Sequence, residues 1–321
     1  MYKTLDKLEK DTREIRNVVR DKLIEQMTAD ERVCYLDADL MNCIGTRKLV
    51  PMFPGRAINC GICEANMIGV AAGMSVSGMI PYCHSFGIFA SRRVMDQAFM
   101  SVAYAKLNVR VLGSDAGVTA ALNGGTHMPF EDMAVYLAIP HAICIEAADC
   151  TQMASIMDQV KDMYGLIYIR FMRKTPIAVY PEGTEFKVGK GAVLRDGDDV
   201  TLVSSGIMVA ESLKAADMLA AEGISARVID MFTWKPIDAE LLEESARKTG
   251  AVVTAENHNY LSGLGVQVAN SLAETYPVPV RRVGIADEFG EVGPESYLRE
   301  RFDLTADHIV REAKKAISMK R

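Results

Sequence analysis

The amino-acid sequence predicts an α/β protein of two domains, each a mostly parallel sheet with helices on both faces. The chain has 321 residues, which suits two domains of roughly 100 to 200 residues each. Apolar, β-branched runs alternate with helical stretches, as is typical of parallel sheets. Prolines and glycines interrupt this alternation at residues 173–191. We therefore expect a first domain at residues 1–182 and a second at residues 183–321.

The first alternation contains a long segment without charge. The runs and stretches that define the alternation lie at residues 33–36, 65–77, 80–83, 109–112, 132–139, 143–146 and 166–169. Residues 65–91 contain no charged side chain, which is long enough for a membrane span of about 20 residues. Their glycines and serines, with Pro81 and His84, are instead typical of a small-residue helix followed by a buried strand. We expect this segment to be interior.

A second alternation follows, with strands expected at residues 200–203, 226–229, 251–254 and 280–283. Gly263, Leu264 and Gly265 open a helix after one of these strands. The third glycine of a dinucleotide fingerprint and its acidic partner are missing. We interpret the motif as a tight helix entry rather than a nucleotide site.

Composition excludes several classes of partner and location. A net charge of -6 disfavours nucleic acid, which needs clustered lysine and arginine. The first residues alternate in charge without the apolar core of a signal peptide, so we expect a cytoplasmic protein. The seven cysteines are an odd set, which suits reduced thiols. Cys60 and Cys63 have zinc-ligand spacing but no second ligand pair, so we expect no metal on this chain.

Glu64 stands just before the charge-free segment, at the expected start of its helix. On local grounds it is a carboxylate in a first helical turn, where the helix dipole stabilises negative charge. Because neutral residues follow for almost thirty positions, Glu64 also lies in a poorly solvated environment. An unpaired carboxylate in such an environment costs free energy. A carboxylate that exchanges a proton near neutrality is a candidate acid or base. The local pattern leaves both interpretations open.

Two further clusters contain candidate ligand-binding side chains. Phe86 and Phe89, three residues apart, suit either stacking on a flat ring or an ordinary core. His127 follows Gly124 and Gly125 in a loop after a strand, at the edge where open α/β sheets bind ligands. A histidine there suits a ligand site as well as it suits a structural role.

Several blocks of the sequence resemble transketolases in their order and spacing. In the first domain they are GICEANMIGVAAGMSVSGMIPYCHSFGIFASRRVMDQAFMSVAYAK at residues 61–106, then GGTHMPFED and IYIRFMRKTP. In the second domain they are TAENHNYLSGLGVQVANSL and RRVGIADEFGEVGPESYL. Nearly the whole chain is covered. The resemblance implies the pyrimidine-binding domain of a thiamine-diphosphate enzyme, followed by a transketolase C-terminal domain.

The resemblance implies that the chain shares a thiamine diphosphate cofactor and transfers a two-carbon ketol unit from a ketose to an aldose. Glu64 matches the glutamate that bonds N1′ of the aminopyrimidine and favours the tautomer whose 4′-nitrogen takes the thiazolium C2 proton. Phe86 and Phe89 would pack on the aminopyrimidine, and Asp39 would lie near cofactor and substrate. The protein positions the cofactor, and the cofactor breaks the bond.

The resemblance places four residues at the substrate. His127 would bond the donor or the reaction intermediate, and Arg173 matches an arginine that holds the sugar phosphate. Two positions depart from the family. Asp115 stands where transketolases usually have a phosphate-contacting histidine, and Asn123 stands where they usually have an acidic residue. An aspartate repels phosphate unless it is protonated or paired, although deoxyxylulose-phosphate synthases also place an aspartate about here. We therefore expect an unusual sugar substrate.

The family also needs a site for the diphosphate and a divalent cation. It builds this site on a separate domain from Gly-Asp-Gly, followed roughly 25 to 30 residues later by asparagine. No Gly-Asp-Gly occurs here, and Asp196-Gly197-Asp198 lacks the first glycine. We therefore expect an N-terminal transketolase subunit that carries the motif and binds Mg²⁺ or Ca²⁺, in an α2β2 assembly with the cofactor at the interface.

Three alternatives remain open. The beta subunit of a 2-oxoacid dehydrogenase first component shares the length and domain order, but the Gly-Gly-Thr-His block favours transketolase. A deoxyxylulose-phosphate synthase fragment fits fewer of the blocks. A non-catalytic assembly partner conflicts with the presence of Glu64, Phe86, Phe89 and His127. We therefore expect an enzyme that is active only with its partner subunit.

Overall fold

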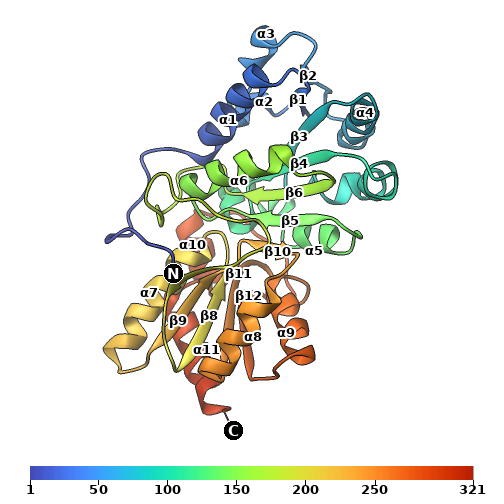
Figure 1. Ribbon diagram of the computed structural model, residues 1–321. Coiled ribbons are helices and arrows are strands. Elements are labelled where there is room, and N and C mark those ends of the chain that lie inside the picture. The colour runs from blue at the N-terminus through green and yellow to red at the C-terminus, as the bar shows by residue number, and fades with distance from the viewer. Residues whose placement is uncertain (321) are drawn as a thin grey trace.

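The computed structural model describes residues 1–320 and contains two α/β domains, one above the other in Figure 1. The strands of the first sheet are β1 (Val33–Asp37), β2 (Ala57–Asn59), β3 (Ile80–Phe86), β4 (Val109–Ser114), β5 (Ile143–Glu146), β6 (Leu166–Phe171) and β10 (Thr233–Lys235). Their spatial order is β10-β5-β6-β4-β3-β1-β2, and every neighbouring pair is parallel except β10 with β5. The four central strands therefore end at one common edge.

Helices cover both faces of the first sheet. On one face α1 (Ile15–Ala29) packs along α6 (Cys150–Asp162), and on the other lie α4 (Glu64–Val76), the π-helical segment η2 (Gln97–Tyr104) and α5 (Asp132–Leu137) (Figure 1). The connections contain α2 (Met41–Ile44), α3 (Leu49–Met52), η1 (Arg92–Val94), η3 (Gly117–Asn123) and η4 (Gly125–His127). Because both faces are covered, every residue of β1, β3, β4 and β6 is buried.

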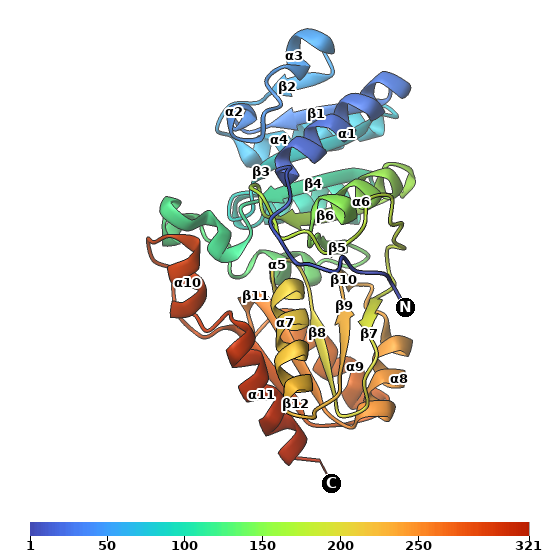
Figure 2. The same cartoon turned by 90° about the vertical axis from the view of Figure 1, so that its left-hand side faces the viewer.

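The second sheet consists of β7 (Ala192–Arg195), β8 (Val200–Ser204), β9 (Ala226–Asp230), β11 (Val252–Asn259) and β12 (Val280–Ile285), in the order β12-β11-β8-β9-β7. Its helices are α7 (Met208–Ala221), α8 (Ala239–Thr249), α9 (Leu264–Glu274), α10 (Glu295–Arg301) and α11 (Ala306–Ser318). Helix α7 packs against α11, and α8 packs against α9. Helix α10 lies against η3 of the first domain (Figure 2).

The predicted fold class is confirmed. The charge-free segment forms α4 and the buried strand β3, and within residues 1–320 no helix is both long and apolar enough to cross a membrane. The predicted helix entry at Gly263 opens α9, whose first amides donate to Glu256. The boundary at residues 182 and 183 lies between β6 and β7 and stays a prediction. Strand β10, which follows that boundary in the sequence, completes the first sheet.

A buried ion cluster joins the two domains. Arg170 of β6 is fully buried, and it donates from Nε to Asp132 Oδ2 at 2.9 Å and from Nη1 to the Glu146 carboxylate. Its Nη2 donates to the backbone oxygen of Asn257 in β11 at 2.8 Å. Glu146 Oε2 accepts a bond of 2.5 Å from Ser205 Oγ of the second domain. Burial raises the pKa of Glu146, and the neighbouring Arg170 opposes that rise. The two domains therefore share one polar core.

Replacing Arg170 with methionine leaves Asp132 and Glu146 buried without their cation. We expect the free energy of unfolding, measured by urea denaturation, to fall by about 3–5 kcal/mol. Arg195→Met is the matched control, because it breaks an exposed pair with Asp217 of 2.6 Å and should cost less than about 1 kcal/mol. Equal losses for the two variants would contradict a special role for the buried cluster.

Candidate active site

The central strands of the first sheet deliver the predicted site residues to one edge. The ladder pairs Asp37 of β1 with His84 of β3, Phe86 of β3 with Ser114 of β4, and Ser114 with Phe171 of β6. Residues just beyond these strand ends are Asp39, Phe89, Asp115 and Arg173. The carboxyl edge of an open parallel sheet is where such folds bind ligands. Segments that are far apart in the sequence thus meet at one place.

Glu64 begins α4, and its N-cap residue Cys63 provides no side-chain cap. Negative charge in this first turn is stabilised by the helix dipole. The Glu64 side chain is 5% exposed, and its Oε1 accepts a bond of 2.8 Å from Nη1 of Arg93. The buried carboxylate of Glu64 is therefore paired. Arg93 is half exposed on η1 and supplies the counter-charge, because a buried carboxylate without a partner is costly.

Phe86, Phe89 and His127 form one cluster, which we call the aromatic platform. The ring centroids of Phe86 and Phe89 are 6.3 Å apart. The imidazole of His127 meets both rings edge-on, with centroid distances of 6.1 Å to Phe86 and 5.3 Å to Phe89. His127 Nδ1 also bonds Thr126 Oγ1 at 3.0 Å. The structure thus brings together three residues that lie in two separate sequence clusters.

Two arginines lie against the platform, and each is paired with a carboxylate. The guanidinium carbon of Arg93 lies 3.9 Å from the Phe89 centroid, and that of Arg173 lies 5.4 Å from the Phe86 centroid. Arg173 Nε is 3.1 Å from Asp115 Oδ2, and the Asp115 side chain is 1% exposed. Arg173 is therefore a partly buried, paired side chain rather than a solvated surface arginine.

A buried chain of hydrogen bonds connects Asp115 to strands β4, β3 and β1. Ser114 Oγ lies 3.2 Å from Asp115 Oδ2 and 3.1 Å from His84 Nε2, and His84 Nδ1 lies 2.8 Å from Asp37 Oδ2. Tyr35 donates its hydroxyl to the same Asp37 oxygen at 2.6 Å. Four of these five side chains are fully buried and Asp115 is 1% exposed, so Asp115 has a fixed position.

Two predicted site residues lie further out. Asp39 is exposed, has a φ of 65°, and accepts a bond of 2.8 Å from Asn59 Nδ2 of β2. Asn123 is exposed at the end of η3. Among the described residues, neither has a hydrogen bond or ion pair to the aromatic platform. Their roles stay predictions.

Arg93 and the chain through His84 are absent from the residues that the sequence predicts for the site. The signal available for Arg93 is the pair Arg92 and Arg93, which ends the charge-free segment. The pairing of His84 with Asp37 has no local signal, because 47 positions separate the two residues. Both contacts depend on how strands and helices pack.

The cysteines of the described chain are free thiols. Cys60 is half-buried and Cys63 is exposed beside Glu64, while burial raises the pKa of Cys60. In residues 1–320, no group of three His, Cys, Asp or Glu side chains is placed to hold a metal ion.

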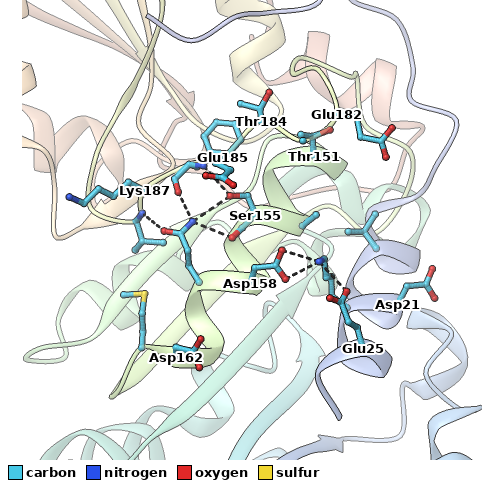
Figure 3. A pocket seen from close by; sticks show the side chains of 18 of the residues that line it. Asp21, Glu25, Thr151, Ser155, Asp158, Asp162, Glu182, Thr184, Glu185 and Lys187 are labelled. Atoms are coloured by element: carbon cyan, nitrogen blue, oxygen red, sulfur yellow. Dashed lines mark hydrogen bonds and ion pairs between the residues drawn. The ribbon is translucent and has the colours of Figure 1, made fainter. Parts of the chain in front are cut away.

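A large cavity lies elsewhere, between α1, α6 and residues 182–188 (Figure 3). It measures about 1100 Å³, and six carboxylates line it against three cations. Lys22 is already bonded to Asp158 at 2.8 Å and Glu25 at 3.1 Å. An acidic lining repels phosphate groups, and none of the predicted site residues lines this cavity. The platform therefore stays the candidate site.

The platform and Glu64 fit an aminopyrimidine ring. A flat heterocycle needs an aromatic face to stack on and a hydrogen-bonding partner in its plane. Phe89 presents such a face. The planar guanidinium of Arg93 lies on this face and donates to Glu64 Oε1 at 2.8 Å. Residues of this chain thus suit one end of thiamine diphosphate.

Comparisons with known proteins agree with this geometry. The profile described as "Transketolase, pyrimidine binding domain" matches residues 11–175, and "Transketolase, C-terminal domain" matches residues 189–309. A "6-deoxy-6-sulfo-D-fructose transketolase subunit SqwH" of Clostridium sp. (strain MSTE9) is 50% identical over 93% of both chains. One subunit of an apulose-4-phosphate transketolase from Phocaeicola vulgatus is 32% identical over 84% of this chain and 86% of its own.

Solved structures and longer relatives show which part of a transketolase this chain corresponds to. A structure titled "Split gene transketolase, inactive beta4 tetramer" has a TM-score of 0.88 and 42% identity, over 96% of this chain and 99% of that one. The transketolase of Mus musculus is 31% identical over 89% of this chain but only 46% of its own length. These matches confirm the predicted fold class and the predicted function of a transferase subunit in a thiamine-diphosphate-dependent family. The chain belongs to the transketolase family and carries its pyrimidine-binding and C-terminal domains.

Proposed function

We propose that the chain is the C-terminal half of a two-subunit transketolase whose N-terminal subunit supplies the diphosphate and metal site. The chain spans about half the length of the mouse enzyme and contains no Gly-Asp-Gly. A similar split-gene transketolase β chain forms a tetramer that is described as inactive. We propose an α2β2 assembly, with Mg²⁺ or Ca²⁺ on the partner and with Asp39 and the platform facing the cofactor.

The observation that carries the proposal is the buried carboxylate of Glu64 beside the aromatic platform. Glu64 would bond N1′ of the aminopyrimidine, and Phe86 and Phe89 would hold the ring by stacking. Thiamine diphosphate, when bound, supplies the carbon nucleophile that accepts and passes on the two-carbon unit. His127 lies on the platform, where it would bond the donor sugar. The chain's own task is to hold rings and move a proton at Glu64.

The ketose donor, we propose, carries a singly charged or neutral end group. Arg173 would bind that end group, together with Asn123. The charge of Arg173 is already compensated by Asp115, whose Oδ2 lies 3.1 Å from Arg173 Nε. A doubly charged phosphate is repelled more strongly by the buried Asp115 than a monoanion is. The relative that is 50% identical is named for a sulfonated fructose, whose sulfonate carries one charge, whereas a relative at 32% identity is named for a sugar phosphate.

We also place the protein in the cytoplasm. The seven cysteines are free thiols, and reduced thiols persist in reducing compartments. A deoxyxylulose-phosphate synthase activity has weaker support, because the matching synthase of Heliobacterium modesticaldum is 33% identical and this chain covers 46% of it.

The isolated chain should neither retain thiamine diphosphate nor turn over a ketose. Adding the N-terminal subunit should restore both, because the cofactor needs groups from each chain. The measurements are cofactor retained after gel filtration and aldehyde release from a ketose donor. Turnover by the isolated chain would contradict the two-subunit proposal, and turnover of a 2-oxoacid by the complex would place it with the dehydrogenases.

Glu64→Gln should lower turnover of the reconstituted complex by about 10²–10⁴-fold, because the proton relay to the cofactor loses its acid. The swap is nearly isosteric, so the melting temperature of the chain should stay within a few degrees. Glu243→Gln is the matched control, since Glu243 pairs with Arg247 on the exposed side of α8 at 2.7 Å. Undiminished turnover would favour a non-catalytic role for the chain.

Asp115→Asn should shift the donor preference toward phosphate. The ratio of kcat/KM for a phosphate-terminated ketose to that for a sulfonate-terminated ketose should rise about tenfold, because one repelling charge is removed. Asp217→Asn, which removes the partner of Arg195 far from the platform, controls for loss of an ion pair. An unchanged ratio in Asp115→Asn would contradict the proposed role of Asp115.

A further inference from the structure

Arg93 touches two groups of the cofactor site at once. Its Nη1 donates to Glu64 Oε1 at 2.8 Å, and its guanidinium carbon lies 3.9 Å from the centroid of Phe89. The first contact is the hydrogen bond that Glu64 would make to an aminopyrimidine. The second is the stacking contact that Phe89 would make to the same ring. One planar group therefore satisfies both at one position.

A second planar group cannot take these contacts while Arg93 holds them. The guanidinium lies over one face of Phe89, and the same group bonds Glu64. A ring that stacks on that face and bonds the same carboxylate would need the same volume. The guanidinium also resembles the N1′-protonated aminopyrimidine, since both are flat and both present an N–H donor in their plane to the carboxylate.

We propose that Arg93 is a positioning residue that acts as an internal stand-in for the aminopyrimidine, holding Glu64 and Phe89 until the cofactor displaces it. The inference rests on the proposed role of Glu64. Arg93 keeps the buried carboxylate paired, which avoids the cost of an isolated charge. The cofactor must break both contacts, so Arg93 weakens its binding while it keeps Glu64 in place.

The surroundings of Arg93 allow this exchange. Its side chain is half exposed, whereas Glu64 is 5% exposed, so the arginine is the mobile member of the pair. A cavity of about 600 Å³ adjoins it, lined by Ile88, Phe89, Arg92, Arg93, Thr126 and His127. The displaced guanidinium has this space and the solvent to enter.

The neighbouring arginine does not share this geometry. Arg92 pairs with Glu131 instead of Glu64, with Nε 3.1 Å from Oε1. The stand-in is thus a property of one side chain and not of a diffuse positive patch. A single substitution at Arg93 is enough to test it.

The test measures the affinity of thiamine diphosphate for the complex reconstituted with the N-terminal subunit and saturating Mg²⁺. Isothermal titration gives the Kd for wild type, Arg93→Met, Arg93→Lys and Arg247→Met. Methionine keeps the length of the stem but removes both contacts. Lysine can still pair with Glu64 but cannot stack as a plane. Arg247→Met is the control, because Arg247 makes the same two kinds of contact in the second domain. Its guanidinium carbon lies 4.4 Å from the Tyr276 centroid, and its Nη2 lies 2.7 Å from Glu243 Oε1.

We expect Arg93→Met to lower the Kd about three- to tenfold, the fold-change that corresponds to losing one half-exposed ion pair and one cation–π contact. Arg93→Lys should give a smaller decrease, and Arg247→Met none. An unchanged or higher Kd in Arg93→Met would overturn the inference, and a higher one would make Arg93 a ligand of the bound cofactor. Failure of the wild-type complex to bind thiamine diphosphate would overturn the proposed function as well.

Discussion

The placement of the site depends on how the buried guanidinium of Arg170 is neutralised. Its partners must converge on one point, because a buried arginine without them is costly. One partner, Asp132, begins α5 directly after the loop that carries His127. Another, the backbone of Asn257, belongs to the second domain. The guanidinium of Arg170 therefore contacts both the start of α5 and the second domain.

The second domain also determines the path of the loop after β4. The Asn257 side chain accepts from the amide of Val118 and donates to the oxygen of Ala116. Gly117 lies between them at a φ of +49°, and a Cβ there would meet Asn257 Oδ1 at 2.2 Å. A Cβ on Gly125 would meet the backbone oxygen of Gly290 at 2.0 Å. A domain that contributes no predicted site residue thus packs closely against the loop that carries His127.

Charge pairing is the common rule at the platform itself. Glu64 and Asp115 are both buried, and each is matched by an arginine that also lies on a phenylalanine ring. A ligand that enters therefore exchanges one set of polar contacts for another and does not meet a bare charge. This arrangement keeps the carboxylates oriented at little electrostatic cost. It also makes the arginines, which are the more exposed members, the groups that can move.

The sequence by itself determined the fold class and most of the parallel strands, and it offered Glu64, Phe86, Phe89 and His127 as candidate site residues. The period of apolar residues is a local property, and the carboxyl ends of parallel strands meet at one edge of a sheet. Only the tertiary structure decided that Arg93 pairs with Glu64 across 29 positions and Arg173 with Asp115 across 58. It also placed β10 in the first sheet. These outcomes depend on which side chains can reach one another after helices and domains have packed, and no local pattern carries that information.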